Sequence, residues 1–147
     1  EAFNIIPDEI ILRGTCRVLD PQIQETLPER LERIVDGVAS TFGAKAELVY
    51  HKGYPATVNS EQASEFCAEV AKEIAGSNEA VDLKPAPSMG AEDFSYMLQK
   101  KPGCYIWTGN GDTAGLHHPE YDFNDETIAV GASYWARLVE KRLPKSP

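Results

Sequence analysis

The stretch Gly115-Leu116-His117-His118-Pro119-Glu120-Tyr121-Asp122-Phe123-Asn124-Asp125 holds two of the three histidines of the chain. It follows the apolar run Cys104–Trp107 and the flexible segment Gly109–Asp112, and it ends where the last helical pattern begins. This order predicts a loop between a buried strand and a helix, a common place for the functional groups of α/β proteins. Imidazole is a frequent ligand of zinc and similar metals. The alternative is a surface histidine pair without a role, and the stretch alone leaves both open.

The rest of the second half alternates helical and strand patterns around this loop. Its predicted elements are a helix that ends at Gly76 with Asn59 and Gln62 as a capping box, strands at 81–84 and 104–107, a short helix at 92–99, and a last helix that starts at Asn124. The side chains predicted to face inward are Ala63, Phe66, Cys67, Val70 and Ile74 on the first helix, and Ile128, Trp135 and Leu138 on the last. This half therefore indicates part of a layered α/β domain.

The first half has the pattern strand, helix, strand. Apolar and polar residues alternate over 9–20 and over 45–54, which predicts two half-buried strands. Between them, Asp20 and Pro21 predict the start of a helix with one apolar stripe, interrupted at Pro28. The composition changes at 55–59, so we place a domain boundary there. The fold class predicted for the whole chain is α/β.

The composition limits the kinds of partner. The chain has 147 residues, 42% of them hydrophobic, which suits one ordinary domain or two small ones. Its formal net charge is −9, and such a surface repels nucleic acids and anionic membranes. No apolar run approaches the ~20 residues of a membrane span. We therefore expect no nucleic-acid partner and no membrane association.

The cysteines and the N-terminus bear on the compartment. Cys16, Cys67 and Cys104 are too few and too far apart for a disulfide framework. Their apolar neighbours predict buried, reduced thiols, which indicates a reducing, cytoplasmic compartment. The chain begins at Glu1 without an initiating methionine and without a visible signal peptide. We expect it to be a piece of a longer protein, so that its N-terminus is silent about targeting.

Two clusters could carry chemistry, whereas a phosphate-binding glycine loop and a serine nucleophile elbow are both missing from the sequence. The stretch Met89–Phe94 lies at a predicted loop-to-helix junction, where it could bind an anion or simply cap the helix. The other cluster is the loop with His117. A zinc site needs three or four ligands, and the only further imidazoles are His51 and His118. If His117 binds a metal, we expect most of its partner ligands to lie elsewhere.

Five segments in this order resemble one family. They are Asn4-Ile5-Ile6-Pro7-Asp8-Glu9, Leu12-Arg13-Gly14-Thr15-Cys16-Arg17, Gly53-Tyr54-Pro55-Ala56-Thr57-Val58-Asn59, Met89-Gly90-Ala91-Glu92-Asp93-Phe94 and the stretch from Leu116 to Asp125. Together they resemble the C-terminal part of the metal-dependent amidohydrolases related to aminoacylase and carboxypeptidase G, in the branch of hippurate hydrolase, N-acyl-amino-acid amidohydrolase and the auxin-conjugate hydrolases. The resemblance covers essentially the whole chain.

The resemblance implies a two-domain subunit. Residues 1–55 resemble the second half of a lid, a four-stranded sheet with two helices through which such subunits form homodimers. Residues 56–147 resemble the C-terminal part of a di-metal catalytic domain. The implied reaction is hydrolysis of the amide bond of an N-acyl amino acid by metal-activated water. It implies two divalent ions in the full-length enzyme, of zinc, manganese, cobalt or nickel.

The family's functional residues carry over at few positions. His117 corresponds to a metal ligand, Asn4 and Arg17 to lid residues that reach the substrate, and Gly90 and Glu92 to a wall of the substrate pocket. The family's His-x-Asp segment and its paired glutamates are not in this chain, so it carries no catalytic residue and should be inactive alone. His118 stands where the family more often has a small polar residue, which leaves the choice of ligand between His117 and His118 open.

Two other readings compete with this one. The chain could be a non-catalytic dimerisation or binding module derived from the same family. It could also be a mononuclear metal-binding protein built on His117 and nearby acidic residues. Only this last reading predicts that the chain binds metal by itself.

Overall fold

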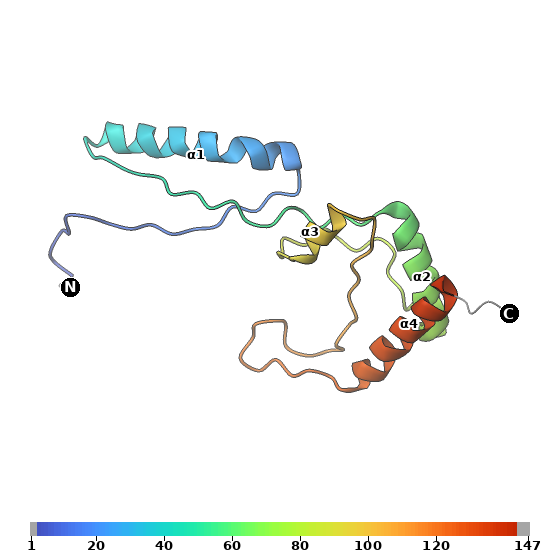
Figure 1. The fold of residues 1–147 in the computed structure, drawn as a ribbon. Coiled ribbons are helices and arrows are strands. Elements are labelled where there is room, and N and C mark those ends of the chain that lie inside the picture. The colour runs from blue at the N-terminus through green and yellow to red at the C-terminus, as the bar shows by residue number, and fades with distance from the viewer. Residues whose placement is uncertain (1–2, 144–147) are drawn as a thin grey trace. The chain divides into compact units, whose positions relative to one another are not determined.

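The structure is a computed structural model and describes residues 3–143. Its four α-helices are α1 (Pro21–Thr41), α2 (Glu61–Ala75), α3 (Phe94–Leu98) and α4 (Glu126–Arg142) (Figure 1). The chain divides into two units between His51 and Lys52, a few residues before the boundary predicted from composition. Their identity as a lid half and the end of a catalytic domain stays a prediction.

The predicted α/β class is wrong for the described residues, because residues 3–143 contain helices and irregular segments but no strand. The segments 9–20, 45–54, 81–84 and 104–107, each predicted as a strand, are irregular. A strand exists only when its backbone pairs with a neighbour, and alternation in the sequence predicts an apolar face without supplying that neighbour. The apolar side chains of 9–20 accordingly stay in water, and Leu12 is 91% exposed.

In the first unit, α1 begins and ends where the sequence predicts. The Asp20 carboxylate accepts a hydrogen bond from the Gln22 N–H at 2.7 Å, and proline occupies the first helical position. The helix continues through Pro28 and stops before Gly43, which has a φ of 64°. None of its residues is buried, and Leu27, Leu31 and Val35 of its apolar stripe are only half-buried.

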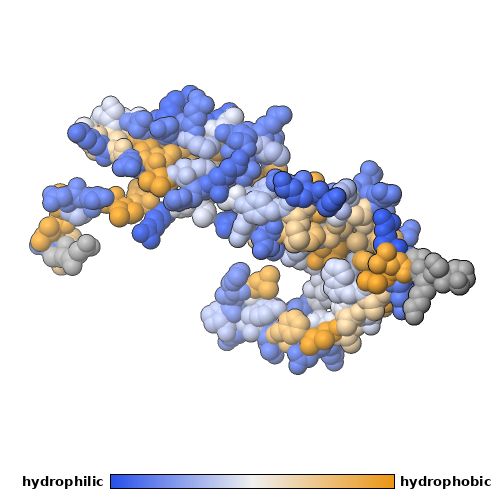
Figure 2. All heavy atoms as spheres, in the orientation of Figure 1, coloured by the Kyte–Doolittle hydropathy of each residue, from blue (hydrophilic) through white to orange (hydrophobic). Residues whose placement is uncertain are grey.

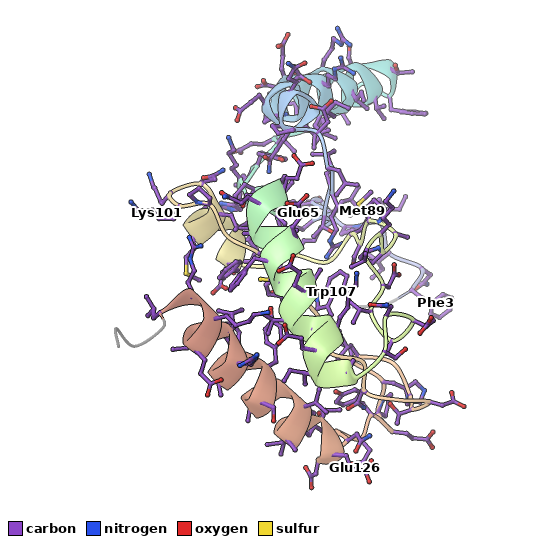
Figure 3. The ribbon with its side chains drawn as sticks, turned by 90° about the vertical axis from the view of Figure 1, so that its right-hand side faces the viewer. Phe3, Glu65, Met89, Lys101, Trp107 and Glu126 are labelled. Atoms are coloured by element: carbon purple, nitrogen blue, oxygen red, sulfur yellow. The ribbon has the colours of Figure 1, made fainter. Side chains whose placement is uncertain are left out.

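In the second unit, α2 and α4 lie side by side and form the core (Figure 3). Its buried residues are Cys67 and Val70 of α2 and Tyr134 of α4. The residues packed around them are Phe66, Ala71, Ile74, Cys104 and Leu138. The predicted inward stripe of α2 is therefore confirmed at Phe66, Cys67, Val70 and Ile74.

The start of α2 differs from the prediction. Ser60, and not Asn59, caps the helix, and its hydroxyl accepts a hydrogen bond from the Ala63 N–H at 3.3 Å. The Asn59 side chain instead pairs with the backbone of Tyr105. It donates to the Tyr105 carbonyl at 2.9 Å and accepts from the Tyr105 N–H at 2.8 Å. Asn59 thus fixes the segment that follows α3 to the N-terminus of α2.

The inward face of α4 was predicted wrongly at two of three positions. Trp135 is 61% exposed and Ile128 is 58% exposed, whereas Leu138 packs against the core as predicted. Tyr134 takes the central place and is 5% exposed, although the spacing to Leu138, four residues from Tyr134 and three from Trp135, suits either aromatic residue. Trp135, one residue on, turns about 100° away from Tyr134 around the helix.

Exposed charges join the same two helices. The Glu73 carboxylate accepts hydrogen bonds from Lys141 and, at 2.9 Å, from Arg137. These bonds, first that of Lys141 and then that of Arg137, lower the pKa of Glu73. Such pairs in water contribute little stability, so packing around Tyr134 dominates this contact.

Apolar side chains lie at the surface of both units (Figure 2). Within residues 3–143, no helix combines the length and the apolar composition needed to cross a membrane. The three cysteines are free thiols. Burial was predicted for all of them; Cys67 is buried and Cys104 is half-buried, but Cys16 is exposed because the segment around it forms no strand.

Candidate functional site

His117 has an unusual backbone conformation. Its φ is 67°, and among residues 3–143 it is the one residue other than glycine with a positive φ. Histidine enters this left-handed region more often than most residues, but the conformation still costs about 1–2 kcal/mol. Such strain persists only where the surroundings enforce it, and it is concentrated at functional sites.

Two consecutive turns enforce this conformation. The His118 N–H donates to the Gly115 carbonyl at 3.1 Å, and the Tyr121 N–H donates to the His118 carbonyl at 3.0 Å. His117 is the third residue of the first turn, the position at which a type II turn requires a positive φ. The first turn therefore fixes the backbone of His117, and the residue is exposed.

The two neighbouring imidazoles differ in what they can bind. His118 Nδ1 accepts a hydrogen bond from the Glu120 N–H at 3.1 Å, so Nδ1 is unprotonated and, in the neutral ring, Nε2 carries the proton. That tautomer leaves His118 no free lone pair for a metal. The ring of His117 makes no hydrogen bond or ion pair with another described residue, so one of its nitrogens is available.

The ends of this loop are joined by Asn110, which sequence reasoning missed. Its Nδ2 donates to the Asp122 carbonyl at 2.7 Å, and its Oδ1 accepts from the Asn124 N–H at 2.8 Å. The sequence around Asn110 indicates only a flexible segment. An asparagine between two glycines was the sole signal in the sequence, and it is typical of any turn.

Local hydrogen bonds hold the second predicted cluster, Met89–Phe94. The Ser95 hydroxyl, fully buried, donates to the Glu92 carbonyl at 2.6 Å, and the Gly90 N–H donates to the Ser88 hydroxyl at 3.1 Å. The pKa of Tyr105 is raised, first by burial and then by the hydrogen bond of its hydroxyl with the Glu92 carboxylate. Asp93, at the start of α3, makes no side-chain cap.

The remaining predicted site residues lie in the first unit. Asn4 and Arg17 are both exposed, and the Arg17 guanidinium donates to the Thr15 hydroxyl at 3.1 Å. In the second unit, a shallow hollow of about 440 Å³ is lined by residues 58–60 and 98–103 and by none of the predicted site residues.

A complete metal centre is not found within the described residues. Across residues 3–143, no three side chains of His, Cys, Asp or Glu come close enough together to hold an ion. A mononuclear centre built on His117 and nearby acidic residues of this chain is therefore unsupported. The available ring nitrogen of His117 fits a divalent ion of the zinc type, but the other ligands would have to come from outside these residues.

The strain at His117 leads to a stability prediction. Replacing His117 by glycine should leave the protein about 1 kcal/mol more stable than replacing it by alanine, since only alanine keeps the steric penalty of a positive φ. Denaturant unfolding of the two variants measures this difference. Gly14, in an irregular segment with no positive φ, offers the matched control, because Gly14→Ala should show no such penalty. Equal stabilities of the two His117 variants would contradict the left-handed conformation.

Comparison with known proteins extends these observations. Residues 5–141 match the family described as Peptidase family M20/M25/M40. The chain is 34% identical over 139 residues to the putative amidohydrolase YhaA of Bacillus subtilis, covering 91% of this chain and 35% of that protein. It is 33% identical over 142 residues to the hippurate hydrolase of Campylobacter jejuni, covering 97% and 37%. It is 29% identical over 137 residues to the N-acetylcysteine deacetylase of Bacillus subtilis, covering 93% and 35%.

The match covers most of this chain but only part of each relative. The chain spans about a third of the length of the curated relatives it matches. No solved structure matches it. The family match nevertheless covers almost all of the sequence, in agreement with the motifs from Asn4 to Asp125. The resemblance predicted from those motifs is confirmed, and the chain belongs to peptidase family M20/M25/M40.

Proposed function

We propose that this chain is part of a metal-dependent hydrolase that cleaves the amide bond of N-acyl amino acids. The observation that carries the proposal is the His117 loop, which displays an imidazole with an available nitrogen in a chain of this family. Two of its relatives are named for the hydrolysis of hippurate and the deacetylation of N-acetylcysteine, and both compounds are N-acyl amino acids.

Each predicted site residue has a role in this proposal. His117 is one ligand of a divalent ion of zinc, manganese, cobalt or nickel, with two ions in the complete enzyme. The bound metal would activate water for attack on the amide. The Arg17 guanidinium, a planar fork of donors, binds the substrate carboxylate, and Asn4 approaches the same substrate. Gly90 and Glu92 form a wall of its pocket.

The test is a hydrolysis assay with the complete polypeptide that contains residues 1–147. We expect it to cleave N-acetylcysteine or hippurate, to stop in the presence of a chelator, and to recover when a divalent metal is added back. The 147-residue chain alone should show no activity, because it lacks most of the metal ligands. Cleavage that is indifferent to the chelator would contradict the metal-dependent mechanism.

A non-catalytic dimerisation module is the second candidate, and one observation favours it. The apolar stripe of α1 is unburied within its unit, with Ile34 59% and Val38 55% exposed. Apolar surface of this kind is commonly covered by a partner. We therefore propose that residues 1–55 form a homodimer. Both the hydrolase and the non-catalytic module would form this dimer, so the hydrolysis assay above distinguishes between these two functions.

The dimer predicts a concentration-dependent mass. Light scattering after gel filtration of the 147-residue chain should give a mass that rises toward twice the monomer value with concentration. Ile34→Asp should weaken the dimer at least tenfold, because the new carboxylate would lose its water at the interface. Glu32→Gln, on the polar face of α1, is the matched control and should change nothing. A constant monomer mass would contradict the dimer.

A further inference from the structure

The side chain of Asn110 uses all of its hydrogen-bonding groups within one loop. Its Oδ1 accepts from the Asn124 N–H at 2.8 Å. Its Nδ2 donates to the Asp122 carbonyl at 2.7 Å and to the Thr113 hydroxyl at 3.0 Å. The Asn110 carboxamide thus donates to Asp122 and accepts from Asn124, the two residues that flank Phe123. These side-chain bonds take the place of backbone hydrogen bonds between the two ends of the loop.

These bonds connect the loop to the rigid part of the unit. Asn124 lies directly before α4, where its own side chain accepts from the Glu126 N–H at 3.0 Å and its carbonyl accepts from the Thr127 hydroxyl at 2.7 Å. In turn, α4 is packed against α2 through the buried Tyr134. The hydrogen bonds of Asn110 to Asp122 and Asn124 therefore tie it to the start of α4 and so to the helix pair.

The other end of the same segment is also fixed. Asn59 binds the N–H and the carbonyl of Tyr105, and the Ser60 N–H donates to the Gly103 carbonyl at 3.0 Å. The chain between Tyr105 and Asn110 is short, so the loop starts and ends at residues that hydrogen bonds hold in place. The path from Asn110 to Asn124 contains the local turns around His117, and the bond between Asn110 and Asn124 closes it.

We propose that Asn110 is a positioning residue that holds the His117 loop in the geometry in which the His117 imidazole can bind a metal. The inference rests on the proposed role of His117. The two turns around His117 fix its local conformation, but they do not fix where the loop lies relative to the helices. The closure by Asn110 supplies that second constraint, and Asn110 itself does not touch the metal.

The first experiment measures the closure itself in the complete polypeptide. Amide hydrogen exchange of Asn124 and of residues 113–122 should become faster in Asn110→Ala, because the Asn124 N–H loses its acceptor. Exchange within α2 should stay the same. Asn78→Ala, a change at an exposed asparagine outside the loop, is the matched control and should leave every rate unchanged. Unchanged exchange in Asn110→Ala would overturn the proposal.

The second experiment measures metal binding with cobalt(II), whose visible absorption reports its ligands. Asn110→Ala should weaken cobalt binding about 10- to 100-fold, the range expected for an outer residue that orients a ligand. Asn110→Gln, which keeps the donors and the acceptor on a longer side chain, should recover part of that affinity. A residue that acted only on stability would lower the melting temperature without shifting the affinity of the folded protein.

The outcomes separate this inference from the proposed function. If His117→Ala loses cobalt binding but Asn110→Ala keeps the wild-type affinity, His117 is a ligand and the positioning role of Asn110 is wrong. If His117→Ala binds cobalt as well as the wild type does, the role proposed for His117 fails, and this inference fails with it. Should Asn110→Ala unfold α4, Asn110→Gln decides instead: faster loop exchange together with weaker cobalt binding supports the proposal, and faster exchange at wild-type affinity overturns it.

Discussion

Replacing His117 by alanine should lower the metal-dependent hydrolysis of the complete polypeptide by more than about 100-fold, while replacing His118 should lower it less than about fivefold. Loss of a residue that only orients a ligand already costs 10- to 100-fold, and loss of a direct ligand should exceed that. His118 instead accepts the Glu120 N–H, a hydrogen bond worth about 1 kcal/mol. The hydrolysis rates of the two variants at saturating metal measure the difference.

The neighbouring position makes His118→Ala a close control, because both substitutions remove the same imidazole from the same loop. The metal content of each purified variant shows whether a lost rate follows a lost ion. The reverse order of effects, with His118 the more sensitive, would mean that the Nδ1 hydrogen bond of His118 does not persist and that His118 is the ligand. Equal, small effects would remove both residues from the metal site.

The sequence predicted the helices better than any other feature of the fold. Helical hydrogen bonds are local, so a stripe such as that of α2 and a cap such as Asp20 are sufficient to locate an element. The strands failed for the opposite reason. Alternation over 9–20 and 45–54 describes one face of each segment, but a strand also requires a paired neighbour, which residues 3–143 do not provide.

Only part of the candidate site could be predicted from the sequence, because residue order reveals local patterns but not contacts between distant residues. The motif around His117 can be read from residue order, and the role of that residue stays a prediction. Its positive φ and the hydrogen bond that occupies His118 depend on the path of the loop. The bonds of Asn110 to residues twelve and fourteen positions away depend on it even more, since no local pattern encodes them.

The choice between Tyr134 and Trp135 shows how packing decides what periodicity leaves open. Both are large aromatic residues at neighbouring positions of α4, and either could face α2. Tyr134 is 5% exposed, and burial together with the hydrogen bond of its hydroxyl with Cys67 raises its pKa. Packing of Tyr134 with Cys67 and Val70 makes its burial favourable at this place, whereas the indole of Trp135 stays in water.

Replacing Tyr134 by alanine should separate α4 from α2. Truncating a buried aromatic side chain costs about 3–5 kcal/mol, which is comparable to the whole stability of many domains. Among residues 3–143, the buried hydrophobic core comprises only Cys67, Val70 and Tyr134, so little other packing can compensate. Amide exchange over α2 and α4 should approach the rates of an unfolded chain in this variant.

Two matched substitutions assign that effect to packing. Tyr134→Phe keeps the ring and removes the hydroxyl, so it should cost only about 1 kcal/mol, the value of one hydrogen bond. Trp135→Ala removes a larger side chain that is 61% exposed and should change stability still less. The expected order of destabilisation, from largest to smallest, is therefore Tyr134→Ala, Tyr134→Phe, Trp135→Ala.

Because the Asn110 closure is attached to the start of α4, loss of the helix pair should also release the His117 loop, and exchange at Asn124 should rise together with that of α4. A protected Asn124 amide in Tyr134→Ala would mean that the loop is held independently of the core.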